Sequence, residues 1–329
     1  MSERLIEILV PQRHAAEVER LVEVAGAQSS WSQSADATTV FKIVAAASED
    51  EEILDALEPT LAGIAEAHVV VLPIEAHLPE RRKEPENDVD EGPRPRTRLG
   101  RAELVADLER HTRTSGAYFV NTMLSALVAA IGLSRDNAAI VLAAMVIAPL
   151  LGPNMALALA ICLGDRDKVL TTLRTGLWGL MTAAAAALLS CLVWSLDPTV
   201  REIATRTSVD LGDVALGLAA GCAGALAISS GVGQSLVGVM VAVALMPPLV
   251  VACGLAVGGH GVEAGRAALL LVANLVCLNL AALVTFTVQG IRPRGWWTLK
   301  QATRQTRMAL ALLGLLLMAL VASILLLQF

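Results

Sequence analysis

Charged residues are scarce in this sequence, at 17% of 329 residues, and aromatic residues are scarcer still, at 3%. Hydrophobic residues reach 55%, a composition that excludes a soluble globular protein of this length. The apolar residues are concentrated after Tyr118, in runs long enough for membrane spans of about 20 residues. We therefore expect an integral membrane protein whose main partner is the lipid bilayer.

Motifs for catalysis, cofactors and nucleic acid are also missing. The cysteines lie within apolar runs and lack the spacing of metal ligands or of a disulfide framework: Cys162, Cys191, Cys222, Cys253 and Cys277. The uncharged link SSGVGQS at 229–235 has no GK[ST], so it is no P-loop. No nucleophile elbow occurs, and the charge pattern gives no sign of nucleic-acid binding. We predict that the protein is not an enzyme and takes no cofactor or metal.

The first 78 residues carry the pattern of a small soluble domain. We predict strands at 4–10, 29–34, 38–46 and 67–74, and helices at 13–25 and 50–64. The order strand, helix, strand, strand, helix, strand (βαββαβ) is that of an α+β ferredoxin-like fold. Two roles stay open: a regulatory domain that senses a ligand, or a domain that associates with its own copies or docks onto the membrane part.

Residues 79–98 are rich in proline and charge and have no periodicity, which predicts a linker. Residues 99–116 carry Leu104, Val105 and Leu108 on one face and charged residues on the other, as in an amphipathic helix. Such a helix can lie at the membrane surface or pack on the soluble domain. The transmembrane domain then occupies 117–329.

Seven spans are predicted in that domain, at about 117–133, 137–163, 175–196, 213–230, 236–258, 266–289 and 308–328. Lys and Arg residues cluster before the first span, between the second and third, and before the seventh. Because basic residues are retained on the cytoplasmic side, the amino terminus is expected in the cytoplasm and the carboxyl terminus outside.

Two apolar stretches in different halves of this domain resemble each other. AAMVIAPLLGPN at 143–154 and GVMVAVALMPPL at 238–249 share Met, Val, Leu and Pro at an offset of 95 residues. The offset relates 117–196 to 212–291 and leaves the span 308–328 outside. Because each half has three spans, the second must be inserted upside down, as in the inverted repeats of secondary transporters. We predict an α-helical polytopic bundle built on a 3+3 inverted repeat with proline-broken helices.

The prolines in both stretches predict carbonyl groups without their helical N–H donors. The affected carbonyls are those of Met145, Pro149, Val243 and Ala244, because Pro149, Pro153, Pro247 and Pro248 stand four residues later. Such carbonyls must face protein, water or a cation rather than lipid. The alternative is an ordinary proline kink relieved by neighbouring Ser or Thr.

Neutral polar residues stand near these breaks or elsewhere in the spans. They are Asn121, Ser125, Gly152 (for its backbone), Asn154, Ser230, Gln234, Asn274 and Asn279. Buried amides in spans often bond to a neighbouring helix, so each of them is either a helix contact or a ligand of the substrate pathway. No charged residue or His lies deep in a span, which disfavours a proton-coupled carrier. Coordination of a cation or of a neutral solute by carbonyls and amides remains.

The blocks GLSRDN, MVIAPLLGPN and ALMPPL, with ANLVCLNLAALVTF after them, resemble the bacterial membrane family called domain of unknown function 389. The resemblance covers roughly 99–290. It implies a prokaryotic integral membrane protein of unsettled function, which we expect in the bacterial inner membrane. Its motif positions here are Asp136, Asn137, Pro149, Gly152, Pro153, Pro247, Pro248 and Asn274.

The leading hypothesis is a transporter or channel-like protein for a small solute or ion, with its pathway between 149–154 and 244–248 and with a cytoplasmic regulatory or oligomerisation domain. The glycine pairs Gly217 with Gly221 and Gly254 with Gly258 permit close helix approach, in packing or in a homo-oligomer. The alternative is a non-transporting membrane scaffold or sensor that binds a ligand or protein through its cytoplasmic domain. A membrane enzyme acting on lipid lacks any visible nucleophile, base or metal cluster.

Overall fold

The computed structural model describes residues 3–24, 30–35, 37–46, 50–61, 63–64, 66–74, 104, 115–230, 234–291 and 296–328. The chain divides into two compact units, Met1–Leu104 and Val105–Phe329. The predicted linker 79–98, and the predicted amphipathic helix 99–116 apart from Leu104, Ser115 and Gly116, lie outside the described residues.

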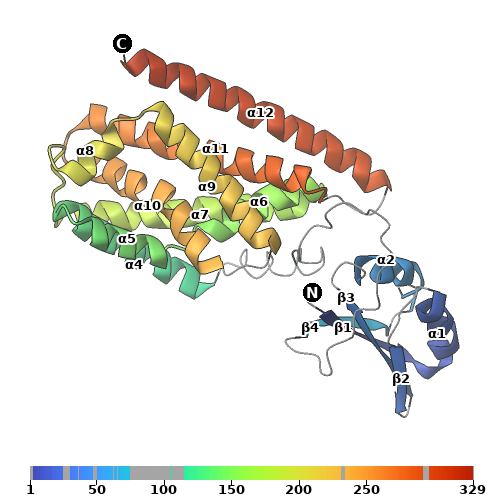
Figure 1. Cartoon of the computed structure of the whole chain (residues 1–329). Coiled ribbons are helices and arrows are strands. Elements are labelled where there is room, and N and C mark those ends of the chain that lie inside the picture. Colours follow the sequence, from blue (N-terminus) through green and yellow to red (C-terminus); the bar gives the residue numbers. More distant parts are fainter. Residues whose placement is uncertain are drawn as a thin grey trace, which may run out of the picture. The chain divides into compact units, whose positions relative to one another are not determined.

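The amino-terminal unit is a four-stranded antiparallel sheet with two α-helices (Figure 1). Its elements are β1 (Glu3–Pro11), η1 (Gln12–His14), α1 (Ala15–Val24), β2 (Ser30–Ala35), β3 (Thr38–Ala46), α2 (Asp50–Leu61) and β4 (His68–Pro73). The strands lie side by side in the order β2-β3-β1-β4. Strands and helices thus alternate along the chain in the predicted order, although α2 ends three residues earlier than expected.

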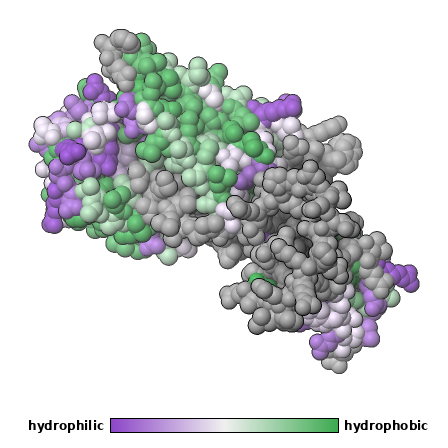
Figure 2. All heavy atoms as spheres, in the orientation of Figure 1, coloured by the Kyte–Doolittle hydropathy of each residue, from purple (hydrophilic) through white to green (hydrophobic). Residues whose placement is uncertain are grey.

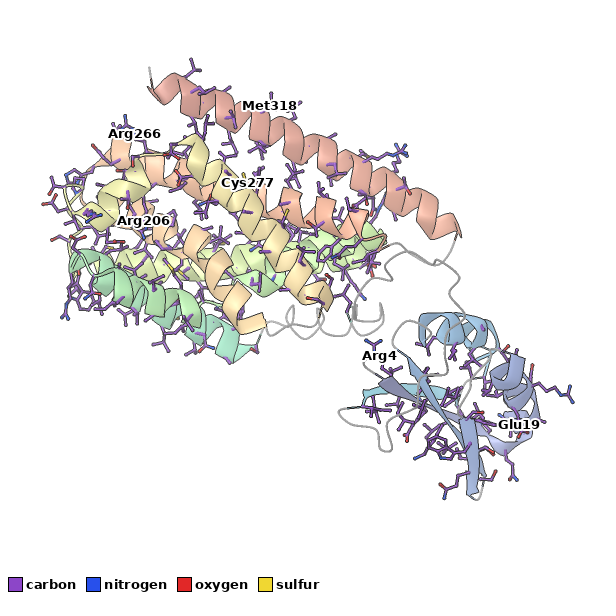
Figure 3. All side chains as sticks on the ribbon, viewed as in Figure 1. Arg4, Glu19, Arg206, Arg266, Cys277 and Met318 are labelled. Atoms are coloured by element: carbon purple, nitrogen blue, oxygen red, sulfur yellow. The ribbon has the colours of Figure 1, made fainter. Side chains whose placement is uncertain are left out.

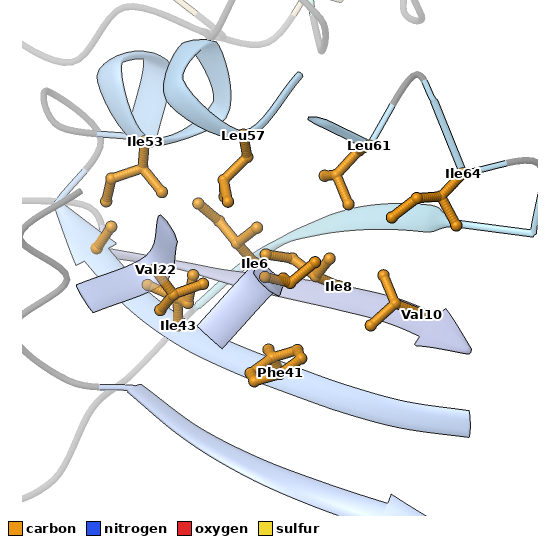
Figure 4. Close-up of a cluster of buried hydrophobic side chains, with 12 residues drawn as sticks. Ile6, Ile8, Val10, Val22, Phe41, Ile43, Ile53, Leu57, Leu61 and Ile64 are labelled. Carbon is orange, nitrogen blue, oxygen red and sulfur yellow. The ribbon is translucent and has the colours of Figure 1, made fainter. Parts of the chain in front are cut away.

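One face of this sheet carries the core of the unit. Side chains alternate between the two faces of a strand, so Ile6 and Ile8 of β1 point to the same side, where they pair with Ile43 and Phe41 of β3. All four are buried. The helices contribute residues one turn apart, such as Leu57 and Leu61 of α2, and these close the cluster over the sheet (Figure 4).

The second unit consists of helices (Figure 1). Its first half holds α4 (Gly116–Ser134), α5 (Ala138–Ile147), α6 (Leu151–Leu163) and α7 (Arg166–Cys191). The second half holds α8 (Arg201–Thr207), α9 (Leu211–Ser230), α10 (Gln234–Val257) and α11 (Gly261–Val288). The last helix is α12 (Trp296–Gln328).

The helices of the two halves recur at the offset seen in the sequence. α4 and α9 begin at Gly116 and Leu211, and α7 and α11 begin at Arg166 and Gly261, in both cases 95 residues apart. The halves also exchange contacts, since α10 packs against α7 and α6 packs against α11.

Five described helices are long and apolar enough to cross a membrane: α4, α7, α9, α11 and residues 302–326 of α12. The bent pair α5 and α6 adds a sixth if it is one span. In α10 only Ala244–Val257 passes as a shorter apolar helix, and the side chains of 234–243 lie outside the described residues. The helices indicate a multi-pass membrane protein, and the count of seven spans stays a prediction.

The starts of α7 and α12 differ most from the predicted ones. α7 begins nine residues before the expected start of its span, because Asp165 caps it by accepting from the N–H of Lys168 at 3.0 Å. α12 runs without interruption from Trp296 and so begins twelve residues before the predicted span 308–328.

On the face of the helical unit that Figure 2 shows, apolar residues cover much of the middle, and hydrophilic residues gather at the end that carries α8. Large side chains of α12 are among the most exposed, with Leu315 and Met318 each 72% exposed. Such a surface is unfavourable in water and fits contact with lipid.

Candidate functional site

The clearest irregularity in the helical unit is the break between α5 and α6. Ala148 follows the end of α5 with an extended ψ of 116°, and the two helices are bent by 50°. Pro149 explains the break, because it cannot donate to the carbonyl of Met145 and disfavours helical geometry at the residue before it. Pro153 is the third residue of α6, where a missing N–H is tolerated. A break therefore lies where the sequence predicts the first one.

The carboxyl end of α5 receives a hydrogen bond from α4. The hydroxyl of Ser125, whose side chain is fully buried, donates to the carbonyl of Ala144 at 2.7 Å. A carbonyl at a helix end in apolar surroundings needs such a donor. The sequence places Ser125 at this locus correctly, although the carbonyl that it reaches precedes Met145 by one residue.

A chain of amides connects the start of α6 with α11. The Nδ2 of Asn154 donates to the carbonyl of Leu150 at 2.8 Å. The Nδ2 of Asn279 donates to the Oδ1 of Asn154 at 3.0 Å and to the carbonyl of Leu275 at 2.9 Å. The Oδ1 of Asn279 is buried and has no hydrogen-bond partner among the described residues. The break and α11 of the opposite half thus share one polar cluster.

The second predicted break is absent, since α10 is helical through Pro247 and Pro248. Pro248 deprives the carbonyl of Ala244 of its helical donor, but the Nδ2 of Asn274 in α11 donates to that carbonyl at 2.8 Å. Ala244 and Asn274 are both buried. The expectation of an unwound α10 is therefore wrong: proline's fixed φ suits a helix, and a neighbouring side chain replaces the lost bond.

Small residues of α9 make room for α11 beside this cap. A Cβ on Gly217 would lie 3.2 Å from the Oδ1 of Asn274, and one on Gly221 would lie 2.6 Å from the carbonyl oxygen of Leu278. The pair GLAAG therefore serves helix packing within the chain, one of the two roles expected of it.

Several predicted site residues lie elsewhere. Asn121 is exposed, because the buried face of α4 runs through Tyr118, Thr122 and Ser125, and Asn121 is rotated by about 100° from Thr122. Ser230 is exposed and donates within its own helix to Leu226 at 2.7 Å.

The remaining predictions divide between the break and the residues not described. Met145, Gly152, Pro153 and both prolines of α10 are buried, and Pro149 is half-buried. The side chains of Gln234 and Val243 lie outside the described residues.

A hydroxyl layer between α4 and α7 was not predicted. The buried Thr122 donates to the carbonyl of Tyr118 at 2.7 Å, and the hydroxyl of Tyr118 donates to the carbonyl of Thr175 at 3.5 Å. The four-residue spacing of Tyr118 and Thr122 is the sequence signal that indicates it.

The motif residues Asp136 and Asn137 connect the turn between α4 and α5 to α8. Asn137 accepts from the N–H groups of Ala139 and Ile140 at 3.0 and 3.2 Å and so caps α5. Asp136, at a φ of 48°, accepts from the N–H of Glu202 in α8 at 2.9 Å. Their role in the structure is thus to hold this end of the bundle.

Charges gather at that end of the unit. Arg206 and Arg266 both lie there (Figure 3). In the loop before α8, the N–H and the hydroxyl of Thr199 donate to Asp197 at 2.8 and 2.7 Å and lower the pKa of its carboxyl. Within the described ranges no group of three His, Cys, Asp or Glu side chains is placed to hold a metal ion.

Comparison with known proteins gives a family. The model of a domain of unknown function, DUF389, matches residues 145–280. An uncharacterised protein of Methanocaldococcus jannaschii is 30% identical over 317 residues, which is 95% of this chain and 95% of that protein. The chain belongs to the DUF389 family. No solved structure matches this DUF389 protein. The stretch matched by the family model includes the break, the prolines of α10, and Asn274 and Asn279.

Proposed function

We propose that this DUF389 protein is a transporter or channel-like protein for a small solute or ion, with its pathway at the break between α5 and α6. The observation that carries the proposal is the buried break with the amide chain of Asn154 and Asn279 beside it. Non-helical backbone at membrane depth is tolerated where it is buried in protein or lines a polar path. Broken helices that hold neutral polar groups inside the bundle are typical of secondary transporters.

The spacing of the helices supports an inverted repeat of 117–196 and 212–291. Two pairs of helices begin 95 residues apart, and several helices of each half pack against the opposite half. With three spans in each half, the halves have opposite orientations in the membrane. The two halves contribute three spans each, and the extra span at 308–328 brings the total to seven.

The distribution of Lys and Arg supports a position in the bacterial inner membrane with the amino terminus in the cytoplasm. The amino-terminal unit, which we assign to the ferredoxin-like fold from its element and strand order, then serves there as a regulatory or oligomerisation domain of a homo-oligomer. The proposal requires no chemical step, and hence no enzyme activity.

A second candidate is a membrane scaffold or sensor that transports nothing. Two observations favour it: the carbonyl of Ala244 is already bonded by Asn274, and among the described residues one face of the amino-terminal sheet carries exposed apolar side chains. On that face an ion pair of Glu7 and Lys42, at 2.8 Å, lies between the exposed side chains of Trp31 and Val70. An open apolar face of this kind suits a partner protein or a second copy.

Purified protein in liposomes separates the two candidates. We expect at least one probe among K⁺, Na⁺, Cl⁻, glycerol and urea to cross these liposomes faster than protein-free ones. Gly152→Trp, beside the break, should lower that flux, because an indole then fills the pathway. Gly314→Trp on α12 is the matched control, since a side chain there meets open space.

Both variants must first match the wild type in size-exclusion profile and thermal unfolding, and Gly152→Val replaces Gly152→Trp if the larger residue prevents folding. Absence of flux for every probe from folded protein would overturn the transport proposal and favour the scaffold.

A further inference from the structure

Two carbonyl groups beside the break, and one in α10, already accept hydrogen bonds from side chains. The carbonyls of Ala144, Leu150 and Ala244 accept from Ser125, Asn154 and Asn274 respectively. Each donor places a positive hydrogen against the oxygen that a permeating cation would have to coordinate. Because cation sites are built from several free oxygens, the bonds to Ala144 and Leu150 leave fewer oxygens for a cation beside the break.

The break also contains the amino-terminal end of α6, where backbone N–H groups can act as hydrogen-bond donors. Leu150 precedes that helix and forms no side-chain cap, whereas Ser115, Asn137 and Asp165 cap the starts of α4, α5 and α7. The first residues of α6 are nonetheless buried. A buried helix start without a cap presents N–H donors and the positive end of the helix dipole to whatever lies before it.

The amide oxygen of Asn279 adds an acceptor to the same place. Asn279 is 8% exposed, and its carboxamide bonds to Asn154, the fourth residue of α6. Its orientation follows from its neighbours. The carbonyl of Leu150 fixes the Nδ2 of Asn154, so the Oδ1 of Asn154 and the carbonyl of Leu275 both require the Nδ2 of Asn279. The Oδ1 of Asn279 is therefore left as an unpaired buried acceptor.

We propose that the first turn of α6 and the Oδ1 of Asn279 together bind a neutral solute that both donates and accepts hydrogen bonds, so that the pathway selects hydroxyl- or amide-bearing molecules over ions. The inference rests on the proposed transport function and names its substrate class. A bare cation satisfies the acceptor but faces the positive helix end, and an anion satisfies the helix end but faces the amide oxygen. A hydroxyl or amide group satisfies both.

Among the described residues, no hydrogen bond at this point involves a charged side chain. The groups that bond beside the break are Ser125, Asn154 and Asn279, together with backbone carbonyls, and all of them are uncharged. An ion that left water for this cluster would therefore lose hydration without gaining a counter-charge, whereas a neutral solute loses far less.

The test uses full-length protein in liposomes and follows two readouts. Light scattering after an osmotic step reports the entry of glycerol and urea, and ion-sensitive dyes report K⁺ and Cl⁻. We expect glycerol or urea to enter at least about tenfold faster than in protein-free liposomes, with no added K⁺ or Cl⁻ flux. Asn279→Leu should lower the solute rate about tenfold, the change that loss of one hydrogen bond produces.

Asn121→Leu is the matched control, because Asn121 is an exposed amide of α4 outside the cluster. If Asn279→Leu does not fold, Asn279→Gln keeps the carboxamide but displaces its oxygen, and it should lower the rate as well. Flux of K⁺ or Cl⁻ without flux of glycerol or urea would overturn this inference and leave the transport proposal standing. Solute flux that both Asn279 variants leave unchanged would overturn the assigned site. No flux of any probe would instead overturn the transport proposal itself.

Discussion

At the offset of 95 residues the two halves of the helical unit share one proline, Pro153 and Pro248, whereas Pro149 of the first half corresponds to Ala244 in the second. In the first half the chain breaks between α5 and α6 with a bend of 50°. In the second half α10 passes through Pro247 and Pro248 as one helix. The corresponding sequences therefore give one broken and one continuous helix.

The difference teaches that both the position of a proline and the partner of the carbonyl it frees decide the outcome, because Pro149, which disfavours helical geometry at Ala148, has no proline counterpart in α10. Asn274 supplies the donor that Pro248 removes, so α10 keeps its helical geometry at Ala244. In the first half, Ser125 bonds to Ala144 instead, which closes the end of α5. The Asn154 amide then begins a new polar cluster at α6.

We expect the largest loss of stability from a change at Asn274, because its amide is the donor to the carbonyl of Ala244 in the second half. Asn274→Leu leaves the buried carbonyl of Ala244 without a donor, and we expect it to lower the free energy of unfolding by about 3 kcal/mol. Unfolding by SDS in mixed micelles measures the change. Asn121→Leu replaces an exposed amide of α4 and should cost much less. Equal losses in the two variants would mean that the Asn274 bond does not hold α10 together.

A second comparison concerns contacts within and between the halves. On α9, Gly221 faces the backbone of α11, whereas a Cβ on Gly224 would lie 3.3 Å from the sulfur of Met155 in α6. Both Gly→Ala changes gain about 1 kcal/mol of helix propensity, so the difference between them isolates packing. We expect Gly221→Ala to be less stable than Gly224→Ala by about 2 kcal/mol, since a backbone cannot yield as a Met side chain can.

Thermal unfolding of the two glycine variants in the same detergent provides the measurement. If Gly224→Ala were the less stable, the contact between the halves would be the tighter one, contrary to the structure.

Much of the fold follows from local sequence patterns. Alternation of apolar residues predicts β1 and β3, and the apolar runs predict α4 and α9 to within two residues at either end. The break after α5 is also local, because Pro149 acts on its own neighbours. Ser125, Asn154, Asn274 and Asn279 were identified as polar residues near the breaks from their positions alone.

Other features depend on residues far apart in the chain. Whether α10 breaks depends on Asn274, thirty residues later, and no pattern around Pro248 shows that this amide reaches Ala244. Asn121 and Ser125 are equally polar in the sequence, and only the packing of α4 separates an exposed amide from a buried hydroxyl. The unpaired oxygen of Asn279 likewise results from a relay through two helices.

The finest test of the comparison combines two changes in α10 and α11. Pro248→Ala restores an N–H that can bond to the carbonyl of Ala244, so Asn274→Leu should cost about 1 kcal/mol less in that background than in the wild type. In the first half Pro149→Ala adds no donor for Ala144, so it should not reduce the cost of Ser125→Ala. SDS unfolding of the single and double variants gives both coupling energies. Zero coupling in α10 would show that the Asn274 amide does not replace the bond that Pro248 removes, and the two halves would then differ for another reason.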